Sequence, residues 1–148
     1  MVVVEFEPTL YTVPETDDVF FRIVKRTATT EDVTVLFSTS PDSAEGINRE
    51  SISVCVLYPS VVILHDSGPG DFDPRSNFLV TIPANEMEVT VEVNITDDDI
   101  VEDVESFTAI LALPANETLV EIGSNFEAVA QIIDNDRKLF SDLEIAIE

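Results

Sequence analysis

Apolar and polar residues alternate along much of this chain, most clearly between residues 87 and 96. One face of that segment carries only apolar residues: Met87, Val89, Val91, Val93 and Ile95. A period of two is typical of a β-strand with one face in a core and the other in solvent. Weaker alternation of the same kind predicts six further strands, at 2–6, 18–25, 32–38, 76–82, 106–113 and 126–133.

Turn-forming residues separate these seven runs. Pro, Gly, Asn and Thr interrupt the alternation at Glu7-Pro8, 27–30, 67–74, 83–85 and 114–117. Short strands with turn signals between them are typical of two packed sheets. The pattern therefore predicts an all-β fold, an antiparallel β-sandwich of about seven strands.

Two segments depart from the pattern. Residues 51–64, "SISVCVLYPSVVIL", hold two β-rich runs joined at Tyr58-Pro59. We expect an extra hairpin there, or a lengthened pair of edge strands, in preference to an exposed apolar surface for a partner. Residues 137–148 are expected to form a linker or tail toward a following domain. The sandwich domain is therefore expected to span 1–136, as a piece of a longer protein.

The chain is strongly acidic. Its 148 residues include 30 Asp and Glu but 7 Lys and Arg, which gives a formal net charge of −23. Such a polyanion is a poor partner for nucleic acid or an anionic membrane surface. No apolar run approaches the roughly 20 residues that span a bilayer, so we expect no direct membrane insertion. Cations and basic protein surfaces remain as partners.

The single cysteine, Cys55, excludes an internal disulfide. Two Asn-X-Thr triplets, at Asn94 and Asn116, match the acceptor pattern for N-glycosylation. Because that modification belongs to the secretory route, the triplets favour an extracellular or cell-surface location.

The acidic residues are most dense in "NITDDDIVEDVESF", residues 94–107, with six carboxylates from Asp97 to Glu105. If successive strands run antiparallel, the strand before Asp97 and the last strand end at the same pole of the sandwich. The same count of chain directions brings four acidic segments to that pole: Glu15, Asp71, 97–105 and 134–136.

Carboxylates gathered without basic partners repel one another unless a cation binds between them. Oxygen ligands suit hard cations, and Ca²⁺ accepts six to eight of them in flexible geometry, whereas Mg²⁺ demands a stricter octahedron. Zinc is not expected, because His65 and Cys55 are the only imidazole and thiol. A solvated acidic turn without metal is the alternative.

An enzymatic function is not expected. Paired carboxylates could serve a glycosidase, but the chain lacks Trp and shows no aromatic platform for a sugar. His65, Asp66 and Ser67 are the residue types of a catalytic triad. Three consecutive residues, however, cannot point at one another as a triad requires.

Six motifs resemble the Calx-β domain in the same order: "YTVPE" (11–15), "DVTVLFST" (32–39), "GDF" (70–72), "VEVNITDDDIVEDVESF" (91–107), "EIG" (121–123) and "AVAQIIDND" (128–136). That family occurs in sodium–calcium exchangers, integrin β4, very large adhesion receptors and extracellular matrix proteins. The resemblance implies an immunoglobulin-like sandwich, in agreement with the alternation.

The resemblance also implies calcium ligands at the matching positions: Glu15, Asp71, Asp97, Asp98, Asp99, the carbonyl of Ile100, Glu102, Glu105, Asp134 and Asp136. Asn135 stands where the strongest exchanger site has an acid, which implies weaker binding or fewer bound ions.

These observations predict a Ca²⁺-binding module of an extracellular adhesion or matrix protein. Bound Ca²⁺ would stiffen the junction with neighbouring domains of the same chain, and a protein partner in adhesion is expected. The alternatives are an intracellular calcium-sensor domain of a membrane transporter, which would be cytosolic, and a structural interaction module without metal.

Overall fold

The computed structural model describes residues 1–44 and 70–136, which form strands and turns but no helix. The strands are β1 (Val2–Phe6), β2 (Leu10–Pro14), β3 (Val19–Lys25), β4 (Val33–Pro41), β5 (Phe78–Ile82), β6 (Glu88–Val93), β7 (Glu105–Ala112), β8 (Val120–Ile122) and β9 (Glu127–Ile133). Within these ranges no helix is long and apolar enough to cross a membrane. The predicted hairpin at 51–64 and the predicted linker at 137–148 lie outside the described residues.

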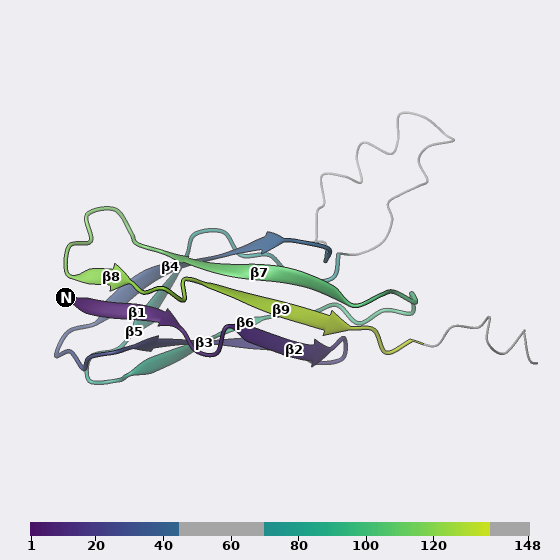
Figure 1. Cartoon of the computed structure of the whole chain (residues 1–148), viewed down its shortest axis with the longest axis horizontal. Coiled ribbons are helices and arrows are strands. Elements are labelled where there is room, and N and C mark those ends of the chain that lie inside the picture. Colours follow the sequence, from purple (N-terminus) through teal and green to yellow (C-terminus); the bar gives the residue numbers. More distant parts are fainter. Residues whose placement is uncertain (45–69, 137–148) are drawn as a thin grey trace, which may run out of the picture.

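The strands form two sheets packed face to face. A four-stranded sheet has the order β6-β3-β1-β8, and a five-stranded sheet has the order β2-β9-β7-β4-β5. All seven strands that the alternation predicts are present, with ends within three residues of those expected. The all-β sandwich is therefore confirmed, and Figure 1 shows its elongated shape.

The sandwich departs from the predicted one in having two further strands, β2 and β8, and two parallel pairings. β1 pairs with β8 in parallel, and β2 pairs with β9 in parallel. After β1 a short turn leads the chain into the opposite sheet, where it continues in the same direction as β2. The chain crosses in the same way from β8 to β9. Because neither crossing reverses the chain, the ends of the strands lie at the poles that the count of chain directions predicts.

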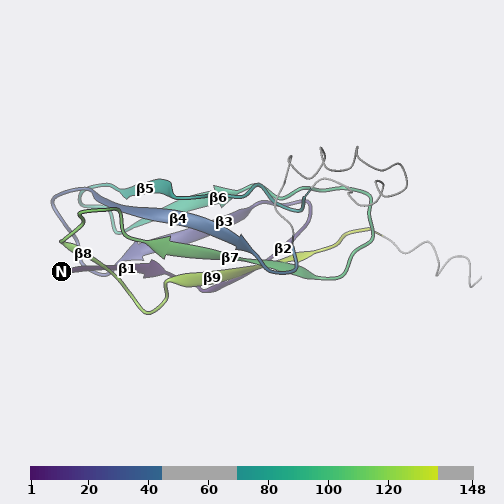
Figure 2. The ribbon, with the colours of Figure 1, turned by 90° about the horizontal axis from the view of Figure 1, so that it is seen from above.

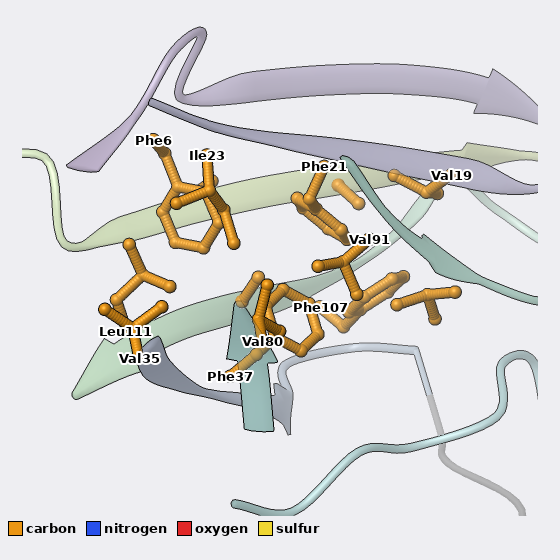
Figure 3. Close-up of a cluster of buried hydrophobic side chains, with 14 of the residues drawn as sticks. Phe6, Val19, Phe21, Ile23, Val35, Phe37, Val80, Val91, Phe107 and Leu111 are labelled. Carbon is orange, nitrogen blue, oxygen red and sulfur yellow. The ribbon is translucent and has the colours of Figure 1, made fainter. Parts of the chain in front are cut away.

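The core is a layer of aromatic and branched side chains between the sheets (Figure 3). Phe21 lies at its centre, with its ring centroid 5.9 Å from that of Phe6, 5.6 Å from Phe37 and 5.9 Å from Phe107. The rings are tilted or edge-on to one another, the arrangement that aromatic pairs favour. All four rings are fully buried, so this layer fixes how the two sheets sit on each other.

Candidate metal centre

The parallel pair β2 and β9 delivers acids from both ends of the sequence to one pole. Pro14 lies beside Ile133 in the ladder, and the Glu15 N–H donates to the Ile133 carbonyl at 2.9 Å. Glu15 and Asp134 therefore leave the sheet side by side. The two arrowheads point to the same end of the molecule in Figure 1.

The run between β6 and β7 crosses the same pole. β6 ends toward it and β7 starts from it, because β6 is antiparallel to β3 and β7 is antiparallel to β9. Figure 2 shows this connection at the end opposite the N-terminus. We call this end, with Glu15, Asp71, 97–105 and 134–136, the acidic pole.

Asp71 is held at the acidic pole by its neighbour Phe72. The Phe72 ring is fully buried and stacks on Phe107, with 4.0 Å between ring centroids and 9° between ring planes. Phe72 also forms a β-bridge with Ile95, and the Thr96 N–H donates to the Asp71 carbonyl at 2.9 Å. The apolar anchor thus places the carboxylate of the preceding residue beside the 97–105 run.

The acids form two groups of three. In each group one carboxylate oxygen per residue lies within 4.8 Å of the other two; the groups are Glu15, Asp98 and Asp136, and Asp71, Glu102 and Glu105. A cavity of about 10 Å³ lies among them, lined by Glu15, Asp71, Glu102, Asp103, Glu105, Ile132 and Asp134. That volume is about the size that one water-sized sphere needs.

Backbone N–H groups hold several of these carboxylates in place. Asp134 accepts from the Glu102 N–H at 3.1 Å and from the Asp136 N–H at 2.9 Å. Asp98 accepts from the Ile100 N–H at 2.7 Å, and Glu15 from the Asn135 N–H at 3.4 Å. The pole is therefore ordered by its own backbone, and Asp134 joins the 97–105 run to the end of β9.

The carboxylates perturb one another's protonation. Burial, and then the charges of Asp71, Asp98, Glu15 and Asp134, raise the pKa of Glu102 to about 7. Burial likewise raises the pKa of Glu15 and Asp136. Partial burial acts in the same direction on Asp134, but hydrogen bonds from the Asp136 and Glu102 N–H groups and with the Glu15 and Asp136 side chains together hold its pKa below the usual value. Without a cation, the acidic pole therefore favours taking up protons near neutral pH.

The donor set fits a hard cation. Every side chain of the two groups offers oxygen, which suits Ca²⁺ and does not suit zinc. The Asp136 Oδ2 atom is buried and has no hydrogen-bond partner in the part of the chain that the structure describes. In those same ranges, the ion pairs of Arg22, Arg26 and Arg75 go to carboxylates outside both groups.

Four residues of the predicted ligand set are members of neither group: Asp97, Asp99, Ile100 and Asp134. Asp97 and Asp99 are exposed, and Asp97 Oδ1 accepts from the side-chain amide of Asn135 at 3.1 Å. Ile100 is 48% exposed. Conversely, Asp103 lines the cavity although it was not predicted as a ligand. It belongs to the same acidic run, so charge density alone could have identified it, whereas the motif did not.

The two predicted glycosylation residues lie in different surroundings. Asn94 is exposed near the acidic pole, and its side-chain amide donates to Asp18 at 3.3 Å. Asn116 is exposed in the β7–β8 turn at the other pole, with φ of 70°. Glycosylation of either residue stays a prediction.

Comparisons with known proteins agree with the geometry. A family model described as the Calx-beta domain matches residues 1–56 and 65–136. No curated protein matches the chain. The matched residues include every residue that lines the cavity.

Several solved structures share the fold. The apo-form Calx CBD1 domain is 24% identical, with a TM-score of 0.67, over 91% of this chain and 98% of that chain. The Calx CBD2 domain is 12% identical, with a TM-score of 0.63, over 98% and 93%. The calcium binding domain CBD12 of CALX1.1 is 23% identical, with a TM-score of 0.66, over 90% of this chain and 46% of that one. This chain thus spans about half of that structure.

Proposed function

The chain belongs to the Calx-beta domain family, and we propose that it binds Ca²⁺ at the acidic pole as a module of a larger protein. The observation that carries the proposal is the convergence of two groups of three carboxylates from four separate segments. Acids placed this close, with one pKa raised to about 7, are costly to keep together without a cation. A binding module, rather than an enzyme, fits this site.

Within the proposal, Glu15, Asp98 and Asp136 would hold one cation position, and Asp71, Glu102 and Glu105 another. Bound Ca²⁺ would supply positive charge that offsets the repulsion among these carboxylates. Asp134 would act mainly by positioning, because both of its oxygens accept backbone N–H groups. Asp97 and Asp99, which belong to neither group, would have to move to join either position.

Of the two settings that the sequence suggests, we place the calcium sensor of a membrane transporter, with a cytosolic location, ahead of the extracellular adhesion or matrix module. One similar structure is named a calcium binding domain, CBD12 of CALX1.1. No comparison supports adhesion, matrix or glycosylation. Because Asp136 directly precedes 137–148, Ca²⁺ bound there would restrain the chain as it leaves the pole toward a neighbouring domain.

Thermal unfolding in Ca²⁺, Mg²⁺ and EDTA tests the proposal. We expect a higher Tm in Ca²⁺ than in equal Mg²⁺ or in EDTA, since a ligand at 100 times its Kd stabilises the folded state by about 2.7 kcal/mol per site. The variants Asp98→Asn and Glu102→Gln, one from each group, should each reduce the shift and the bound stoichiometry measured by calorimetry.

Glu31→Gln serves as the matched control, because Glu31 is an exposed acid in the β3–β4 turn at the other pole. It removes one carboxylate and should leave the calcium shift unchanged. Equal Tm values for the unmodified chain in Ca²⁺ and EDTA would contradict metal binding. A full shift in both pole variants would contradict the assignment of ligands.

A further inference from the structure

The outer faces of the two sheets differ in charge. The outward side chains of the four-stranded sheet include Glu5, Arg22, Glu88, Glu92 and Glu121. Arg22 pairs with Glu88 on this face, and Arg26 pairs with Glu5 at 2.7 Å. This face therefore carries ion pairs and further acids, which suit contact with water, beside the exposed side chain of Phe20.

Among the residues that the structure describes, the strands of the five-stranded sheet place one charge on its outer face. Strand alternation and burial assign to it Leu10, Thr12, Pro14, Thr34, Leu36, Ser38, Ser40, Leu79, Thr81, Ser106, Thr108, Ile110, Ala112, Glu127, Val129, Gln131 and Ile133. We call this set the neutral face. A quarter of the chain is charged, so an even spread would put about four charges on these seventeen positions, since charged residues belong on surfaces.

An apolar stripe crosses the neutral face. Leu79 is the ladder partner of Leu36, and Leu10 is the partner of Val129. Ile110 lies between them on β7, one diagonal step from Leu36 and one from Val129. Diagonal neighbours on one face of a sheet are about 7–8 Å apart, within reach of long side chains. The stripe therefore runs across all five strands.

Hydroxyl groups fill most of the remaining neutral face. Thr34 and Thr81 lie 3.1 Å apart across β4 and β5, and either oxygen can be the donor. In the described ranges, the charges nearest to these hydroxyls lie at the margins of the face, where Glu127 is exposed and Asp42 accepts from the hydroxyls of Ser106 and Thr108. A basic partner would be drawn to the acidic surfaces instead, because this face offers it almost no opposite charge.

We propose that the neutral face binds the neutral face of a second copy of this chain, related by a two-fold axis. A two-fold contact requires a surface that is complementary to itself. Hydroxyls meet this condition because each one donates and accepts, and apolar side chains meet it as well. Surfaces with an excess of acids are not complementary to themselves, since like charges would face each other. In a molecule of net charge −23, this face lets two copies meet with little direct repulsion.

The size of the face sets the strength of the contact. Five strands about 4.8 Å apart and about seven residues of 3.4 Å each cover roughly 550 Å² per copy. Stable complexes bury about 800 Å² per partner, so the contact belongs to the weak, reversible class. The remaining acids still repel at a distance, and salt screens that repulsion. Self-association should therefore be strengthened by salt, whereas contacts built on ion pairs are weakened by it.

Sedimentation equilibrium of the 148-residue chain in EDTA, from about 10 µM to 1 mM and at low and high NaCl, tests this proposal. Using EDTA keeps the result independent of calcium binding. We expect a dimer whose fraction rises with concentration and with salt. Leu10→Glu and Leu79→Glu, at opposite edges of the neutral face, should each lower the dimer fraction severalfold.

Phe20→Glu is the matched control. Phe20 lies on the outer face of the four-stranded sheet and is 54% exposed, against 56% for Leu10 and 62% for Leu79. It introduces the same charge and should leave the dimer intact, while circular dichroism checks that all three variants are folded. A monomer under all conditions overturns the proposal, as does association that weakens with salt or is equally lost in Phe20→Glu. Loss in only one of the two leucine variants would indicate pairing at a strand edge and would also overturn it.

Discussion

Asn135 shows how one residue alters the acidic pole. It stands between Asp134 and Asp136, and its amide donates to Asp97 Oδ1 at 3.1 Å. The partial positive charge of this amide stands where a cation could otherwise bind the same oxygen. The contact turns Asp97 toward Asn135, and Asp97 belongs to neither group of three.

Replacing Asn135 with Asp should strengthen calcium binding. The change frees Asp97 and adds a carboxylate, and affinity in such sites rises with the number of charged ligands, so we expect a roughly tenfold lower Kd or an additional bound ion. Isothermal titration calorimetry gives both quantities. Asn135→Ala frees Asp97 without adding charge and is the control; an unchanged titration for Asn135→Asp would show that position 135 lies outside the site.

Glu102 should make the stability of the calcium-free protein depend on pH. Its pKa is raised from 4.5 to about 7 on folding, so between these values the folded state binds more protons than the unfolded state. The contribution of Glu102 to the free energy of unfolding must then fall as pH rises from about 4.5 to 7 and level off above it. Urea unfolding in EDTA at several pH values measures this slope.

Glu102→Gln should flatten that slope, because the amide does not titrate. Ca²⁺ competes with the proton for the same oxygens, so calcium affinity should fall as pH drops below 7. A variant that keeps the whole slope would assign the pH dependence to other groups, of which Glu15 and Asp136 also have raised pKa values.

At the level of elements, the two crossings between the sheets shape the fold. The crossing from β8 to β9 is held by Glu5, which accepts from the Asn125 N–H at 3.2 Å and pairs with Arg26. Gly123 lies against this carboxylate and donates its own N–H to the Val4 carbonyl at 2.9 Å. The arrangement needs a residue without a side chain, since Glu5 occupies the space.

Gly123→Ala should destabilise the domain. A Cβ at this position would lie 2.5 Å from Glu5 Oε2 and 3.0 Å from Val3 Cγ1, so the carboxylate would have to leave its donors. We expect a loss of about 1–3 kcal/mol, the usual cost of overpacking. Chemical denaturation measures it, and the double variant Gly123→Ala with Glu5→Ala tests the cause: if the clash with Glu5 is responsible, the two losses will add to more than the double variant shows.

At the scale of the whole molecule, charge is distributed by region. Among the described residues, acids collect at one pole, the outer face of the four-stranded sheet carries ion pairs and further acids, and that of the five-stranded sheet is almost neutral. Each bound Ca²⁺ would remove two negative charges from a total of −23. The acidic pole and the neutral face are separate surfaces, but bound Ca²⁺ would change the net charge and therefore the repulsion between two copies. Measuring self-association in EDTA holds that repulsion constant.

The sequence by itself determined the fold class, seven of the strands and the pole at which the acids gather. Period-two alternation reports which residues face a core, and reversal of direction at each turn is enough to sort strand ends between two poles. Glu15, Asp71 and the 97–105 run could therefore be brought together without knowing the sheets. β8 escaped detection because it has three residues, and β2 because it follows Pro8 and ends at Pro14, residues that mark turns.

Only the tertiary structure decided which strands are neighbours and which oxygens meet. The alternation of a strand says nothing about its partner, so the crossing of the first and last strands between sheets, and their parallel pairing, could not be read from it. The same holds for the Asn135 amide that donates to Asp97, for the Glu102 N–H that donates to Asp134 and for the contrast between the two outer faces. Each depends on residues far apart in sequence, whose distances are set by the packing of the two sheets.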